Sequence, residues 1–96
     1  MAKPPTLQIS AEEIEALFAG LDIWTKVRDG RFSDLPLLSR RRPSTGYPGG
    51  MSDIVRHENA AGYHVATTHR ITMPDGSVPH WDAKDIHIGS IIIWAM

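Results

Sequence analysis

The second half of the chain alternates between β-rich runs and tight-turn signals, and this pattern constrains the fold most. Turns are marked at Asn59-Ala60-Ala61-Gly62 and at Pro74-Asp75-Gly76, whose residues favour hairpin connections. Runs rich in Val, Ile, Thr and aromatic residues flank both turns. The pattern predicts an antiparallel meander with a bend at 82–85 and with strands at about 52–58, 63–73, 77–81 and 86–96.

One amphipathic helix precedes this meander. Ser10, with Glu13 three residues later, has the spacing of a capping box, and Gly20 is a natural C-terminal stop. The apolar residues between them recur at helical spacing and form a single stripe. Because such a stripe must be covered, the helix is expected to pack on the sheet.

The segment that joins the helix to the meander supports two interpretations. Residues 23–27 are β-branched and aromatic and lead to the turn signal Asp29-Gly30, which favours a strand. A helix that continues through Trp24 is compatible with the same residues. Residues 39–50 are rich in arginine, glycine and proline, and we expect them to form an exposed loop.

Together these elements predict an α+β fold, with the N-terminal helix packed on an antiparallel meander sheet of four to five strands. The 96 residues suffice for one domain with a single core. Residues 1–8 are rich in proline and are expected to be a frayed tail, so that residues 9–96 form the domain.

Composition excludes several classes of function. The chain has no cysteine, so disulfides, thiolate metal ligands and cysteine nucleophiles are excluded, and a reducing cytoplasm is favoured. The N-terminus lacks the apolar run of a secretion signal, and no apolar run is long enough to span a bilayer. The net charge of −1 gives no global attraction for nucleic acid. We therefore expect a soluble cytoplasmic protein without a cofactor and without a membrane partner.

All five histidines lie between His57 and His87, on the predicted strands. If Met73 pairs with Ser77 across one turn, and Asn59 with Gly62 across the other, the strands bring three of these histidines to one polar face. That face would carry seven side chains: Asp53, His57, His64, Thr68, Arg70, His80 and Asp82.

The same register assigns a structural role to a fourth histidine. Side-chain parity in the strand at 63–73 places His69 on the core face, opposite Trp81. A histidine that faces a core is usually a neutral ring bonded to backbone groups. In this register Arg70 lies opposite His80, and His57 lies opposite His64.

Metal-independent cleavage of RNA is the sharpest enzymatic hypothesis for this face. His64 or His57 would act as the base, His80 as the acid and Arg70 as the phosphate clamp. Small ribonuclease toxins use comparable parts, but no sequence motif links this chain to a named family. The alternative is that these side chains decorate a solvated sheet face.

A metal site is a weaker hypothesis for the same residues. Histidines 57, 64 and 80 with Asp82 could supply nitrogen and oxygen ligands, but Arg70 in their midst would repel a cation, so no metal is expected there. Asp85 with His87 would be a minimal second site. None of the familiar metal-binding spacings occurs.

The sequence favours a non-enzymatic function, namely a small binding or regulatory module. An anionic or aromatic ligand would sit between the loop and the polar face, in contact with Tyr47, His57, His64, Arg70, His80 and Asp82. The loop arginines Arg40, Arg41 and Arg42 would contact phosphate or an acidic partner. A small inhibitor or adaptor of a larger partner is a further alternative.

The C-terminal strand also predicts a subunit contact. Residues 91–94 are apolar on both faces, as in a strand that is covered on both sides or lies at a subunit interface. We expect a homodimer through Ile91, Ile93 and Trp94.

Overall fold

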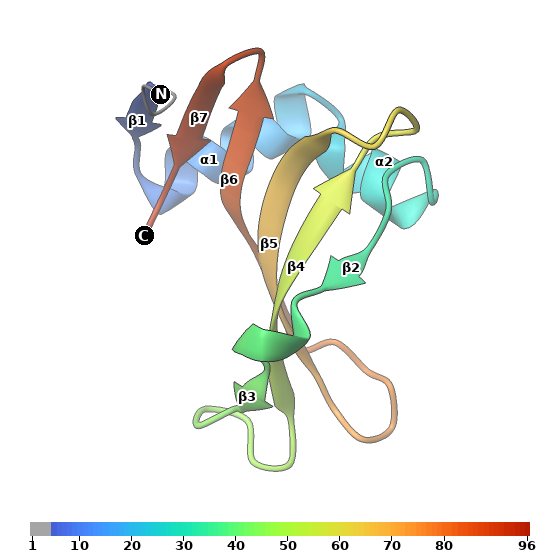
Figure 1. Cartoon of the computed structure of the whole chain (residues 1–96). Helices are drawn as coiled ribbons and strands as arrows, with labels where there is room; N and C mark the ends of the chain where they lie inside the picture. The colour runs from blue at the N-terminus through green and yellow to red at the C-terminus, as the bar shows by residue number, and fades with distance from the viewer. Residues whose placement is uncertain (1–4) are drawn as a thin grey trace.

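The computed structural model describes residues 5–96 and confirms the predicted α+β class. Two helices, α1 (Ala11–Gly20) and α2 (Ile23–Arg28), lie on one side of a seven-stranded, mostly antiparallel sheet (Figure 1). Strand order is β1-β7-β6-β5-β4-β2, and β3 also pairs with β4. The strands are β1 (Thr6–Gln8), β2 (Leu35–Pro36), β3 (Arg42–Pro43), β4 (Met51–Glu58), β5 (His64–Thr72), β6 (His80–Ile88) and β7 (Ile91–Trp94).

The predicted meander is present as β4-β5-β6-β7, but the bend expected at 82–85 is wrong. Those residues belong to β6, in which the pairing with β5 skips Lys84 as a β-bulge. The turn lies later, at Gly89, whose φ of +57° is one that glycine adopts without strain. The charged residues at 82–85 favoured a bend in the sequence analysis. They remain within a strand because of the bulge, for which the sequence carries no local signal.

The N-terminal helix is built as predicted. Ser10 and Glu13 form a reciprocal capping box, and both Ile14 and Phe18 are fully buried against the sheet. Glu15 then joins three elements, since its carboxylate accepts hydrogen bonds from the Trp24 indole at 3.1 Å and from the backbone of β6 at 2.8 Å. Within residues 5–96 no helix has the length and apolarity that a membrane crossing requires.

Residues 23–28 form helix α2 rather than the favoured strand. Ile23 and Val27 lie one helical turn apart and are both buried, which lets the segment cover the sheet beside α1. Trp24 packs between Phe18, at 5.1 Å between ring centroids, and Trp81, at 5.4 Å. Burial of this aromatic cluster overrides the β propensity of the individual residues.

Part of the tail predicted at residues 1–8 is a strand. Thr6–Gln8 pairs in parallel with β7, and the backbone N–H of Ile92 donates to the Pro5 carbonyl at 3.0 Å. Residues 1–4 lie outside the described part of the chain. Strand β1 thereby covers the outer edge of β7, so the C-terminal strand is flanked on both sides.

The sequence prediction assigned the wrong face of the sheet to the core. The face covered by α1 and α2, here called the helix face, carries Ala66, Thr68 and Ala83, which are 0–4 % exposed. The other face, here called the open face, carries His69. The small residues on the helix face leave room for the bulky rings of α1, α2 and Trp81. The sequence prediction chose the other set of alternating residues as the core face because those residues are on average more hydrophobic.

The register differs from the expected one at both hairpins. Met73 and Ser77 do pair, through a backbone hydrogen bond of 2.9 Å, but a one-residue shift then places Ile71 opposite His80, and His69 opposite Asp82. At the other hairpin Glu58 pairs with His64, one residue beyond the expected register, and a second bulge at Val65 then places His57 opposite Ala66 instead of His64. A one-residue shift exchanges faces, so the predicted polar set is divided.

Candidate functional site

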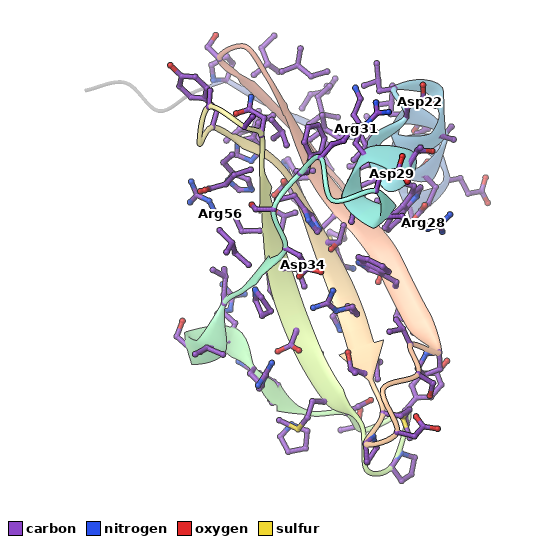
Figure 2. The ribbon with its side chains drawn as sticks, turned by 90° about the vertical axis from the view of Figure 1, so that its right-hand side faces the viewer. Asp22, Arg28, Asp29, Arg31, Asp34 and Arg56 are labelled. Atoms are coloured by element: carbon purple, nitrogen blue, oxygen red, sulfur yellow. The ribbon has the colours of Figure 1, made fainter. Side chains whose placement is uncertain are left out.

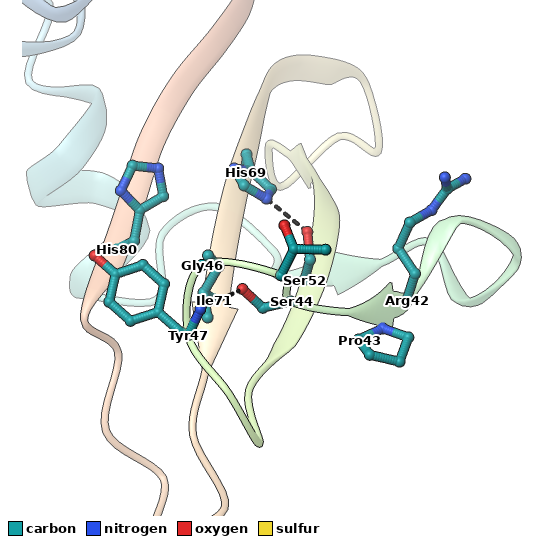
Figure 3. Close-up of a pocket in the computed structure, with 10 residues that line it drawn as sticks. Arg42, Pro43, Ser44, Gly46, Tyr47, Ser52, His69, Ile71 and His80 are labelled. Atoms are coloured by element: carbon teal, nitrogen blue, oxygen red, sulfur yellow. Dashed lines mark hydrogen bonds between the residues drawn. The ribbon is translucent and has the colours of Figure 1, made fainter.

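The segment 42–47 folds over one end of the open face and encloses a hollow against β4, β5 and β6 (Figure 3). Its volume is about 300 Å³, and an adjoining hollow of about 330 Å³ shares Arg42, Ser52 and His69 with it. These volumes lie at the lower end of the range for sites that hold small molecules. We call the two hollows together the loop hollow.

A chain of polar contacts crosses the floor of the loop hollow. Ser52 Oγ lies 2.6 Å from His69 Nε2, and His69 Nδ1 lies 3.2 Å from Asp82 Oδ1. His80 Nε2 approaches the same carboxylate oxygen at 2.8 Å, and the Lys84 ammonium reaches the other oxygen at 2.9 Å. Asp82 therefore holds two imidazoles and a lysine in fixed positions on the open face.

The three consecutive arginines divide between two environments. Arg41 makes two hydrogen bonds to Asp53, at 2.7 and 3.2 Å, and that carboxylate is 2 % exposed. The hydrogen bond to Asp53 is the main reason that the pKa of Arg41 is raised. Arg40 and Arg42, by contrast, line the loop hollow, and within residues 5–96 neither forms an ion pair.

Tyr47 provides an aromatic wall at the mouth of the loop hollow. Its backbone N–H donates to Ser44 Oγ at 3.2 Å, which fixes the loop over the strands. The Tyr47 and His80 ring centroids are 6.5 Å apart, and their planes differ by 29° (Figure 3). Gly50 is closely packed beneath this loop, because a Cβ there would lie 3.0 Å from Ile71, from Met73 and from the Tyr47 carbonyl oxygen.

Arg70 does not join the histidines as predicted. It lies on the helix face, where its guanidinium pairs with Asp34 and stacks over Trp81 at 5.2 Å. His64 and His80 are also separated, because His80 pairs with Ile71, seven residues along β5 from His64, or roughly 20 Å at the usual rise of a strand. The three residues named for ribonuclease chemistry therefore do not share a site.

His57 is the core histidine of this protein, a role that the sequence had assigned to His69. The ring is 0 % exposed, its Nδ1–H donates to the Ser33 carbonyl at 2.9 Å, and its Nε2 accepts from Thr68 Oγ1 at 2.8 Å. Burial lowers the pKa of His57, so the ring is neutral near pH 7. His57 is therefore unavailable to a ligand on the open face.

Of the predicted ligand contacts, Tyr47 and His80 line the loop hollow, and Asp82 contacts its lining residue His80. Sequence reasoning missed Ser52 and Lys84 as site residues and assigned His69 to the core. Lys84 reaches Asp82 through the bulge in β6, for which the sequence carries no signal. The remaining histidines, His64 and His87, form a separate cluster with Asp85 farther along the open face.

Comparisons of the chain with protein-family models, with curated proteins and with solved structures found no significant match to any of them.

Proposed function

We propose that this protein is a small binding module whose loop hollow takes an anionic ligand with a planar ring. The observation that carries the proposal is the juxtaposition of Arg42 with the Tyr47–His80 pair in one of the two adjoining hollows, and of Arg40 with Arg42 in the other. Arginine presents a planar fork of donors that matches phosphate and carboxylate groups.

Charge in the loop hollow favours an anion. Lys84 and Asp82 neutralise each other at 2.9 Å, which leaves the two guanidinium groups of Arg40 and Arg42 as net positive charge. Electrostatic attraction by fixed cations in a concave site raises both affinity and the rate of association. An acidic ligand is therefore preferred over a neutral one of the same shape.

The aromatic pair favours a flat group on the ligand. The Tyr47 and His80 rings, 6.5 Å apart between centroids, both line the loop hollow, so a planar ring on the ligand would have an aromatic face to stack on. A nucleoside monophosphate combines such a ring with a phosphate and is the probe that we choose. Its size is compatible with a hollow of about 300 Å³.

Calorimetric titration of the full chain with adenosine monophosphate tests the proposal. Binding should weaken at least tenfold in Arg42→Ala and in Tyr47→Ala, and inorganic phosphate alone should bind more weakly than the nucleotide. Arg31→Ala, which removes a charge beside α2 on the helix side of the sheet (Figure 2), should bind normally. Absence of heat with the nucleotide and with phosphate, or equal loss in Arg31→Ala, would refute the proposal.

The contacts from Ser52 through His69 to Asp82 favour serine-dependent hydrolysis as a second candidate. The serine hydroxyl is 2.6 Å from one ring nitrogen, and the carboxylate is 3.2 Å from the other, which is the relation of nucleophile, base and orienting acid in serine hydrolases. A fluorophosphonate reagent should then label Ser52, and Ser52→Ala should abolish both labelling and hydrolysis of a nitrophenyl ester. A folded wild-type protein that takes up no reagent would exclude this candidate.

A homodimer through the C-terminal strand is proposed on the sequence evidence. Because β1 pairs along β7, subunits would meet through side chains rather than by adding a strand at residues 92–94. Ile91 is 44 % exposed and available for such a contact, whereas Ile93 and Trp94 are half-buried within the chain. A cytoplasmic location is likewise proposed, supported by the cysteine-free composition.

A further inference from the structure

A second cluster of potential metal ligands lies on the open face, away from the loop hollow. One nitrogen each from His64 and His87 and one oxygen from Asp85 all lie within 4.8 Å of one another. His64 comes from β5, and the other two come from β6. The bulge at Val65 brings His64 beside His87, with 3.9 Å between the ring centroids. We call this group the upper cluster.

The His64 ring is held as a metal-ligating histidine would be. Its Nε2 lies 3.0 Å from the Ala66 carbonyl oxygen and 2.8 Å from Thr67 Oγ1. Since a carbonyl only accepts, Nε2 carries the hydrogen, and the lone pair of the neutral ring is on Nδ1. Ligating histidines typically donate their other ring N–H to a carbonyl or carboxylate, which fixes the tautomer and the orientation.

Asp85 supplies an oxygen that lacks a hydrogen-bond donor. Its Oδ1 is buried, and no donor within residues 5–96 satisfies it. His87 Nε2 lies 3.3 Å away, but the two groups are not aligned as a hydrogen bond. The neighbours of Asp85 across the sheet are Thr67 and Trp94. A buried carboxylate oxygen without a donor is unfavourable, and a bound cation would compensate for it.

We propose that His64, Asp85 and His87 bind a divalent transition metal ion of the zinc type. Two imidazoles and a carboxylate are a ligand set that zinc accepts, and the fourth position would be left to solvent. Zinc–ligand bonds of about 2.0–2.1 Å place neighbouring ligand atoms about 3.3 Å apart. The Asp85–His87 contact already has that length.

The equivalent ligand set in the loop hollow provides an internal comparison. His69, His80 and Asp82 also lie within 4.8 Å of one another. There, however, the Lys84 ammonium is 2.9 Å from Asp82 and would repel a cation, and Ser52 occupies a ring nitrogen of His69. Near the upper cluster, the positive charge of Arg56 on β4 would repel a metal ion. The Arg56 guanidinium is, however, 2.9 Å from the Glu58 carboxylate, which offsets that charge. Figure 2 shows that Arg56 projects on the side of β4 away from the helices.

Titration of the metal-free full chain with Zn²⁺ and with Co²⁺ tests the proposal, which is independent of ligand binding in the loop hollow. We expect one Zn²⁺ per chain by calorimetry, a raised melting temperature, and visible Co²⁺ absorption of the intensity typical of tetrahedral coordination. His87→Ala and Asp85→Asn should each weaken Zn²⁺ binding by about tenfold to a hundredfold. His80→Ala is the matched control and should bind Zn²⁺ as the wild type does.

Two results would overturn the assignment. The first is a wild-type protein that shows neither binding heat nor a change in melting temperature with Zn²⁺. The second is loss of binding in His80→Ala with retention in His87→Ala, which would place the metal in the loop hollow. If His87→Ala does not fold, His87→Gln retains the size of the side chain and removes the imidazole ligand.

Discussion

The buried histidine should make the protein sensitive to mild acid. His57 is enclosed on the helix face, where Nδ1–H donates to Ser33 and Nε2 accepts from Thr68. Thr68 Oγ1 also accepts from the Trp81 indole at 2.8 Å. A proton on Nε2 would leave the Thr68 hydroxyl without its acceptor and would place a charge in the core. The folded state therefore resists protonation of His57.

The sign and the upper limit of the effect follow from linkage. Burial lowers the pKa of His57 in the folded state, whereas the unfolded chain has the ordinary value of 6.5. Above pH 6.5 the ring is neutral in both states and contributes no pH dependence. Below pH 6.5 the unfolded state binds the proton, and stability falls by up to about 1.4 kcal/mol per pH unit. Between pH 6.5 and pH 5.0 the loss from this site is at most about 2 kcal/mol.

Urea denaturation followed by tryptophan fluorescence measures this loss. His57→Gln keeps a donor and an acceptor in the core but does not titrate, so it should lose up to about 2 kcal/mol less stability than the wild type between the two pH values. An NMR titration of the His57 ring should give a midpoint below 6.5. A midpoint at or above 6.5, or identical acid losses in the two proteins, would refute the reasoning.

Three further predictions concern packing and assembly. Glu15→Ala removes the acceptor of two partly buried donors and should lower the free energy of unfolding by about 2–4 kcal/mol in urea denaturation, with a smaller loss in Glu15→Gln. Gly50→Ala forces a Cβ to within 3.0 Å of Ile71 and should cost about 1–3 kcal/mol in the same assay; an unchanged midpoint would contradict the close packing. Trp94→Ala should shift sedimentation from dimer toward monomer, and a monomeric wild-type protein would dismiss the proposed subunit contact.

The elements that the sequence predicted well are those with local signals. The helix that begins after Ser10 has its capping box and its apolar stripe, and both are realised. The strands beside the 59–62 and 73–77 turns follow from turn residues and β propensity. These signals act over a few residues, so they do not depend on what the rest of the chain does.

The helix at residues 23–28 and the orientation of the sheet depended on long-range packing. The segment around Trp24 is helical because, in that conformation, the Trp24 ring packs between Phe18 and Trp81, which lie elsewhere in the chain. Thr68 could face the core because Trp81 and His57 satisfy its hydroxyl. Neither partnership is visible in the local sequence, where threonine indicates a solvated face.

By itself the sequence determined the α+β class, the N-terminal helix, the meander and the concentration of histidines on its strands. Only the tertiary structure decided which histidines meet, because two bulges, at Val65 and Lys84, set the alignment of β5 with its neighbours. Side chains alternate between faces at every residue, so one skipped position transfers a ring from the core to the surface. The bulge at Val65 thus places His64 on the open face with His69, in a separate cluster, whereas His57 lies on the face that the helices cover and is enclosed.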